Sequence, residues 1–250
     1  WGQEKIHHFM TQQRDTYKYI HDQSVRLMNA GYTSTEIAEE LSLPASLANN
    51  FSNRGYYGTV SHNAKAVYQG YLGWYDGNPA NLDNLPTAST AERYVSLMGG
   101  EDNVLEAAQD SFKSGDYRWA AELLNKLVFS DSENSEAKAL LAKTYDQLGY
   151  QSESGPWRDV YLTAAFELRH GAPDKGVDIA LMEDVLRHTP LHKFFDSMAV
   201  RLDGKAAEGE NYIINITFSD LHESHILSIE NAVLHHKKSA PVPNANASLT

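Results

Sequence analysis

The sequence predicts a mainly α-helical protein: a tetratricopeptide-like helical region followed by a partial α+β segment. Three observations predict this fold class. Apolar residues recur at helical spacing through the first part of the chain, a 34-residue repeat runs through residues 102–169, and strand-like alternation begins only after residue 210. We therefore divide the 250-residue chain into a helical domain, 1–188, and the N-terminal part of an α+β domain, 189–250.

The first segment carries the clearest helix pattern. Apolar residues at spacings of three, four and seven predict one helix from residue 3 to about residue 30, and Gly31 follows it as a C-cap glycine would. Thr33 and Glu36 have the spacing of a capping box, which predicts a second helix starting there. Pro44 is expected to stop or restart that helix.

The next segment alternates loops with short helices. The glycines and polar residues of 52–63 predict a tight loop, and a helix is expected over 63–73. Residues 76–86 are dense in Gly, Asn, Asp and Pro, so they predict a second loop. A short helix is expected over 90–98, before two consecutive glycines.

An internal repeat occupies residues 102–169. Gly115 and Gly149 lie 34 residues apart, and so do Ala108 and Ala142. This period is typical of tetratricopeptide helix hairpins. In such a hairpin we expect the glycine to permit the turn, the small residue to let the helices approach, and the aromatic residue after the glycine to pack inside. Two periods are fewer than the three that usually stand alone, so neighbouring helices must cover the ends.

The composition changes after about residue 190. The apolar pattern predicts an amphipathic helix over 191–202, and β-branched alternating stretches predict strands at 211–218, 224–230 and 232–236. Asn231 is expected in or near the turn between the last two strands. The remaining Pro-, Asn- and Ala-rich residues are expected to connect to structure outside this chain, so the sheet should be small and incomplete.

Composition excludes several classes of function. Lys and Arg number 21 against 33 Asp and Glu, a net charge of −12, so the surface repels phosphate backbones and we expect no nucleic-acid partner. The chain has no cysteine, which excludes disulfides, thiolate zinc sites and cysteine nucleophiles. No apolar run approaches the roughly 18 residues of a membrane-spanning helix. Because the chain opens on tryptophan, we expect a fragment of a longer protein, with any signal peptide upstream.

The eleven histidines do not form a recognisable metal site. His7 and His8 diverge around a helix, and His235 and His236 point to opposite faces of a strand. The sequence contains no His-x-His-x-Asp-His, no HExxH and no Gly-x-Ser-x-Gly motif. A helix-turn-helix pattern near residues 31–51 lacks a basic second helix. We therefore expect no complete metal site, no catalytic triad and no DNA-binding helix in this chain.

Residues 54–63, RGYYGTVSHN, form the candidate site. They place a guanidinium, two phenols, two aliphatic hydroxyls, an imidazole and an amide within ten positions. Such groups suit an anion, because they donate several hydrogen bonds and the imidazole can donate or shuttle a proton near neutral pH. The alternative is a buried loop that packs its tyrosines against helices. The candidate residues are Arg54, Tyr56, Tyr57, Ser61, His62 and Asn63.

Four blocks carry a family resemblance: RGYYGTVSHN, KAVYQGYLGWYDGNPANLDNLP, GDYRWAAELLNKLVFSDSEN and LLAKTYDQLGYQSESGPWRDVYL. Over about residues 1–190 the chain resembles the linear primary alkyl sulfatases of the metallo-β-lactamase superfamily. The stretches INITFSD and SIENAVLHH are similar to the sterol-carrier-protein-2-like domain that ends those enzymes.

The resemblance implies a parent enzyme of three parts that hydrolyses primary alkyl sulfates, such as dodecyl sulfate, to alcohol and sulfate. A metallo-β-lactamase-like domain carries two zinc ions, a TPR-like helical domain makes the homodimer, and a sterol-carrier-like domain accepts the alkyl chain. This chain resembles the second part and the start of the third. The zinc ligands are missing, so the resemblance implies that the isolated chain is inactive and binds no zinc. It also favours a periplasmic or secreted location.

The resemblance also implies roles for the candidate residues. His62 is expected to contact the sulfate or the leaving oxygen as a second wall of the active site. Tyr56 or Tyr57 is expected to line the same entrance, with Arg54, Ser61 and Asn63 as further substrate-binding residues. Two alternatives stay open: a TPR-type interaction module that binds a partner peptide, and a lipid carrier built on the C-terminal strands, although these look too short to enclose a ligand.

Overall fold

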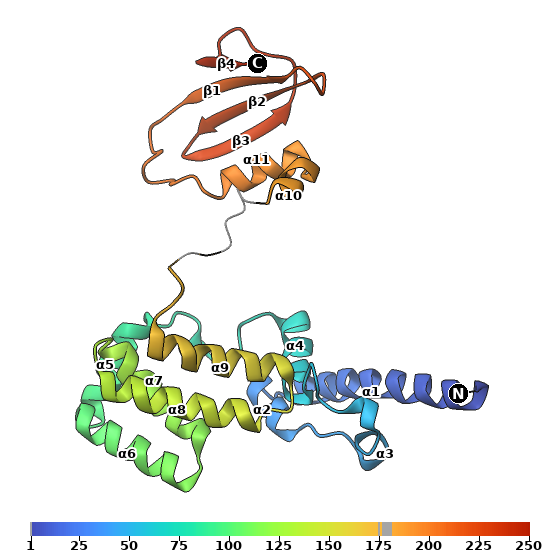
Figure 1. Ribbon diagram of the computed structural model, residues 1–250, viewed down its shortest axis with the longest axis vertical. Helices are drawn as coiled ribbons and strands as arrows, with labels where there is room; N and C mark the ends of the chain where they lie inside the picture. The colour runs from blue at the N-terminus through green and yellow to red at the C-terminus, as the bar shows by residue number, and fades with distance from the viewer. Residues whose placement is uncertain (1, 175, 177–181) are drawn as a thin grey trace. The chain divides into compact units, whose positions relative to one another are not determined.

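A computed structural model describes residues 2–174, 176 and 182–250, and these divide after Pro173 into two compact units. The first unit is all helical, and the second contains two helices and a four-stranded sheet (Figure 1). The mainly α fold class with an α+β segment is therefore confirmed. Among the described residues, no helix combines the length and apolarity that crossing a bilayer requires.

The N-terminal helices follow the predictions. Helix α1 spans Gln3–Asn29, α2 spans Ser34–Glu40, and α3 spans Ala45–Ala48. The capping box is present, because the backbone N–H of Thr33 donates to the Glu36 carboxylate at 2.8 Å and the Glu36 N–H donates to the Thr33 hydroxyl. Helix α2 ends before Pro44, and α3 begins directly after it. One apolar cluster joins α1 and α2 to helix α4, Val60–Leu72, and its buried members are Ile20, Leu27, Ile37, Leu41, Ala64 and Tyr68.

The loop predicted at 52–63 ends earlier in the structure than in the prediction. A 3₁₀ turn, η1, covers Phe51–Asn53, and helix α4 spans Val60–Leu72, so the helix begins three residues before the predicted position. The reason is a capping interaction at Thr59, whose side chain accepts the backbone N–H of His62 at 2.9 Å. Ser61, His62 and Asn63 therefore lie in the first turn of a helix.

A polar loop with a 3₁₀ turn, η2 at Pro79–Asn81, follows α4 and leads to α5, Thr87–Leu97. The predicted repeat then forms four helices: α6, Glu101–Ser114; α7, Tyr117–Ser130; α8, Ser135–Gln151; and α9, Gly155–His170. Consecutive helices of this set pack against each other (Figure 1). Helix α5 packs on α7, so a neighbouring helix covers the repeat there, as we expect for an array of only two repeats. The central core residues Leu124 and Leu127 are fully buried.

The two repeat glycines have different roles, which corrects the prediction of two equivalent turns. Gly115 ends α6 with a φ of +86°, the left-handed conformation that favours glycine, and Tyr117 after it stacks edge-on with Phe112. Gly149 instead lies inside α8, where an added Cβ would come within 2.9 Å of Leu162 on α9. Tyr150 is 68% exposed rather than packed in a hairpin. Gly149 thus permits close approach of α8 and α9.

The packing around Gly149 and the open space around Gly70, a second helical glycine, predict opposite effects of changing each to alanine. Gly149→Ala is expected to lower the free energy of unfolding by about 1–3 kcal/mol, because the new methyl group overlaps Leu162. Gly70→Ala in α4 meets open space and is expected to raise it by about 0.5–1 kcal/mol, because alanine favours the helix. Urea denaturation measures both. A Gly149→Ala protein as stable as the wild type would contradict the packing role.

In the described residues of the second unit, two helices precede the sheet. Helix α10, Glu183–His188, was not predicted, and α11 spans Leu191–Ala199, shorter than the predicted 191–202. The α11 residue Phe195 is almost fully buried and packs against the rings of His225 and His236. His236 also donates a hydrogen bond of 2.8 Å to the Asp196 carboxylate, and this bond lowers the pKa of Asp196.

The sheet has the strand order β3-β2-β1-β4. The three predicted strands are confirmed with small boundary shifts, as β1, Tyr212–Phe218; β2, Glu223–Glu230; and β3, Val233–Lys238. Asn231 lies in the β2–β3 turn with positive φ, as does Ala232. The last residues, which we expect to connect onward, also contain a strand that was not predicted: β4, Ala247–Leu249, pairs in parallel with β1. Its three residues are too few to show a clear alternation in the sequence.

Candidate functional site

The candidate segment is held in place by the start of α9, almost 100 residues further along the chain. The backbone N–H of Gly155 donates to the carbonyl of Tyr56 at 2.8 Å, and the Ser154 hydroxyl donates to the carbonyl of Tyr57. Ser154 is only 1% exposed, and its oxygen also caps α9 by accepting the backbone N–H of Trp157. One buried hydroxyl therefore fixes both the loop and the helix that meets it.

The Arg54 side chain is already engaged by two partners. Its Nη2 pairs with a carboxylate oxygen of Glu153, and its guanidinium carbon lies 5.5 Å from the centre of the Tyr56 ring. Arginine has five N–H donors, so this ion pair leaves donors for a further anion. Because the groups are exposed, the pair orients Arg54 rather than adding much stability.

The two tyrosines differ in their surroundings. Tyr56 packs on Phe51, with ring centres 5.2 Å apart, whereas Tyr57 is 82% exposed. The alternative of a buried loop that packs its tyrosines against helices therefore does not hold, because Tyr56 is also exposed. Of the two phenols, Tyr57 has the greater solvent access.

The imidazole of His62 contacts α9. It projects from the first turn of α4 and is exposed, and its Nδ1 accepts a hydrogen bond of 3.3 Å from Nε1 of Trp157. The two rings meet edge-on, with centres 6.2 Å apart. The backbone of His62 is held separately by the Thr59 cap.

The remaining two candidates lie beside His62 on the same helical turn. Ser61 is half-buried, and the amide of Asn63 lies against Gly58. A Cβ at position 58 would come within 2.9 Å of the Asn63 oxygen, so a larger residue there would displace the Asn63 amide. The structure thus gathers the six candidates on one loop and the first turn of one helix.

Sequence reasoning missed the residues that support this segment, namely Glu153, Ser154, Gly155 and Trp157. The only signal for them is the block QSESGPWR, which carries part of the family resemblance but shows no partner by itself. Together the segment and its support offer hydroxyl, imidazole, amide and guanidinium donors at a helix N-terminus, an arrangement that can stabilise negative charge on oxygen.

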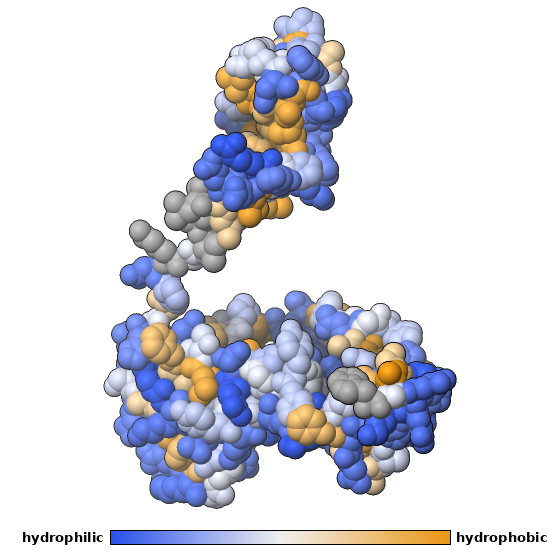
Figure 2. Space-filling model, turned by 45° about the vertical axis from the view of Figure 1, so that its right-hand side comes forward, coloured by the Kyte–Doolittle hydropathy of each residue, from blue (hydrophilic) through white to orange (hydrophobic). Residues whose placement is uncertain are grey.

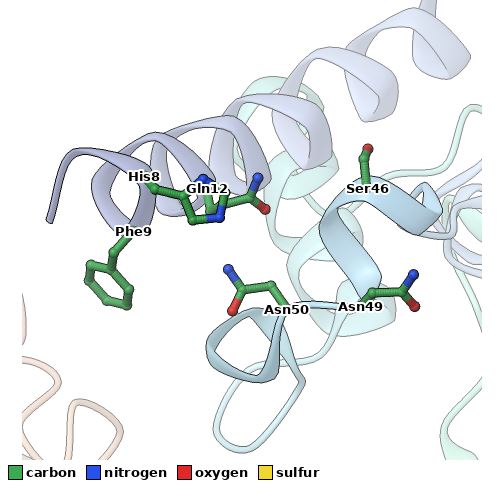
Figure 3. Close-up of a pocket in the computed structure, with 6 residues that line it drawn as sticks. All are labelled: His8, Phe9, Gln12, Ser46, Asn49 and Asn50. Atoms are coloured by element: carbon green, nitrogen blue, oxygen red, sulfur yellow. The ribbon is translucent and has the colours of Figure 1, made fainter. Parts of the chain in front are cut away.

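A separate hollow of about 400 Å³ lies between α1 and the segment around α3 (Figure 3). Gln12 and Asn50 are on opposite sides of it, and the six candidate residues do not line it. The neighbouring Gln13 donates a 2.7 Å hydrogen bond to the side chain of Asn53, so α1 braces the start of the candidate segment. The lining residues are His8, Phe9, Gln12, Ser46, Asn49 and Asn50.

The resemblance places its zinc pair in a domain outside this chain, and the described residues offer no site for it. Within the described part of the chain, no three His, Asp or Glu side chains come together in a group that could hold a metal ion. The carboxylate–histidine contacts that occur, such as Asp196–His236 and Asp22–His21, are pairs.

Two family models match the chain. A model described as alkyl sulfatase dimerisation matches residues 33–171, and one described as alkyl sulfatase C-terminal matches residues 180–250. The chain is also 45% identical over 250 residues to a linear primary-alkylsulfatase of Pseudomonas sp., covering all of this chain and 37% of the relative. It is 47% identical over 238 residues to the alkyl/aryl-sulfatase BDS1 of Saccharomyces cerevisiae, covering 93% of this chain and 36% of that protein.

A solved structure is similar over the whole chain. The stereoselective inverting sec-alkylsulfatase Pisa1 from Pseudomonas sp. superposes with a TM-score of 0.91 at 41% identity, covering 100% of this chain and 40% of that one. The chain therefore spans less than half the length of the relatives that it matches.

Proposed function

The chain belongs to the alkyl sulfatase family, and from this premise we propose that it is the homodimerising, substrate-contacting segment of an enzyme that hydrolyses primary alkyl sulfates such as dodecyl sulfate. The products are an alcohol and sulfate. The observation that carries the proposal is the donor-rich segment 54–63, which the buried Ser154 holds against α9.

The chemistry of this segment suits a sulfate ester. Negative charge develops on oxygen atoms whether the C–O or the S–O bond breaks, so oriented hydrogen-bond donors stabilise the transition state in either case. We assign that contact to His62, with Arg54, Tyr56, Tyr57, Ser61 and Asn63 as substrate-binding residues. The N-terminal end of α4 adds a favourable dipole for an anion.

Because the described residues form no metal cluster, we assign the two zinc ions to a part of the protein outside this chain. We therefore expect the isolated chain to be inactive.

The same proposal makes this chain, as a whole, the part of the enzyme that forms the homodimer. Large apolar side chains remain exposed on the helical unit, among them Tyr94, Leu97 and Phe166, and Figure 2 shows apolar surface on both units. The hairpins of α6–α9 also favour the alternative, a TPR-type module that binds a partner peptide. Light scattering distinguishes them, because a stable dimer of the chain supports the first and a monomer that captures a peptide supports the second.

The activity is tested with the full-length protein. We expect zinc-loaded enzyme to release sulfate from dodecyl sulfate, and this chain alone to release none. A secondary substrate, octan-2-yl sulfate, tests the preference for primary esters, since relatives with both preferences are similar to this chain. A folded, zinc-loaded full-length protein that hydrolyses neither ester would contradict the proposal. Faster release from the secondary ester would overturn the primary preference.

A further inference from the structure

We propose that Trp157 is a positioning residue for His62: its indole N–H holds the imidazole so that Nδ1 is the acceptor and Nε2 carries the only ring proton. The inference rests on the proposed function, because it concerns how His62 meets the sulfate ester. It adds a residue from α9 to a site that is otherwise built from one short segment.

The direction of the contact follows from chemistry. An indole Nε1–H only donates, so the nitrogen 3.3 Å away, Nδ1 of His62, must accept and carry no proton. A neutral imidazole with a bare Nδ1 has its proton on Nε2.

Trp157 is itself fixed. Its backbone N–H donates to the buried Ser154 hydroxyl, which also holds the Tyr57 carbonyl, and its ring is half-buried at the start of α9. His62 is exposed, so few neighbours other than Trp157 restrain its ring. Without that restraint the ring is free to turn about its Cβ–Cγ bond and exchange the places of its nitrogens and carbons. The indole N–H thus sets the ring orientation, while the Thr59 cap sets the backbone.

This arrangement defines what His62 does. A neutral Nε2–H donates a hydrogen bond to the sulfate or ester oxygen on which charge develops, and it keeps its proton throughout. No proton leaves the ring, so no proton donor is needed to restore it. His62 is then an electrostatic stabiliser whose effect depends on its orientation.

The test is a double-mutant cycle in the full-length enzyme. Trp157→Phe keeps the aromatic edge and removes the N–H. We expect it to lower kcat for dodecyl sulfate about tenfold, the size of one hydrogen bond, with KM changed much less. In a His62→Ala background the same change should have almost no further effect, because Trp157 acts through His62. Equal losses of kcat in the two backgrounds, or no loss at all, would overturn the proposal.

A matched control is Trp119→Phe, which removes the indole N–H of a half-exposed tryptophan on α7 and is expected to leave kcat unchanged. NMR of this chain provides a readout that needs no activity. We expect His62→Ala to shift the Trp157 indole proton and to speed its exchange with water. An indole proton unaffected by His62→Ala would refute the contact, even if the enzyme proved to act on another substrate or if Trp157→Phe failed to fold.

Discussion

Replacing His62 by alanine in the full-length enzyme is expected to lower kcat about 10²–10³-fold, the range seen when one preorganised donor to a developing oxyanion is removed. The imidazole donor contributes most in the transition state, where charge on the ester oxygens is greatest, so KM should change far less. Steady-state sulfate release measures both constants. The side chain is exposed and alanine suits the first turn of α4, so we expect the free energy of unfolding to change by no more than about 0.5 kcal/mol.

His170→Ala provides the matched control for this experiment. His170 is an exposed histidine at the C-terminal end of α9, so its removal tests for general effects of losing an imidazole. We expect wild-type kcat from that variant. If His62→Ala folds normally and keeps wild-type kinetics, His62 is not part of the active site.

Replacing Leu127 by alanine is expected to lower the free energy of unfolding of the helical unit by about 2–5 kcal/mol. Leu127 is fully buried in the cluster that joins α5, α6, α7 and α8, so truncation both loses apolar contacts and leaves a cavity. Typical domains have only about 5–15 kcal/mol of stability, so the loss is a large share of the total. Urea denaturation followed by circular dichroism measures it, at one fixed protein concentration because dimerisation would add to apparent stability.

The control for this prediction is Leu97→Ala on α5. Leu97 is 82% exposed, so the same truncation should change the stability of the isolated monomer by no more than about 0.5 kcal/mol. Equal destabilisation by the two variants would mean that the cluster around Leu127 is not the core of the helical unit.

Errors in the predicted fold fall where a single tertiary contact or a short element decides the outcome. The hydrophobic period predicted α1 almost to the residue, because a long amphipathic stripe is a strong local signal. The same reasoning placed Gly149 in a turn, yet the structure has it inside α8 because the side chain that requires its small size, Leu162, lies on the next helix. Strand β4 was missed because three residues carry too little pattern.

The sequence by itself determined the helical class, the 34-residue repeat, the three main strands and the short segment that holds all six candidate residues. These features depend on local periodicity, capping residues and residue chemistry, which can be seen in one stretch of chain. Only the tertiary structure decided that Ser154 and Trp157 support this segment, because the two stretches lie almost 100 residues apart and no local pattern encodes which distant groups a loop carbonyl or an imidazole will meet.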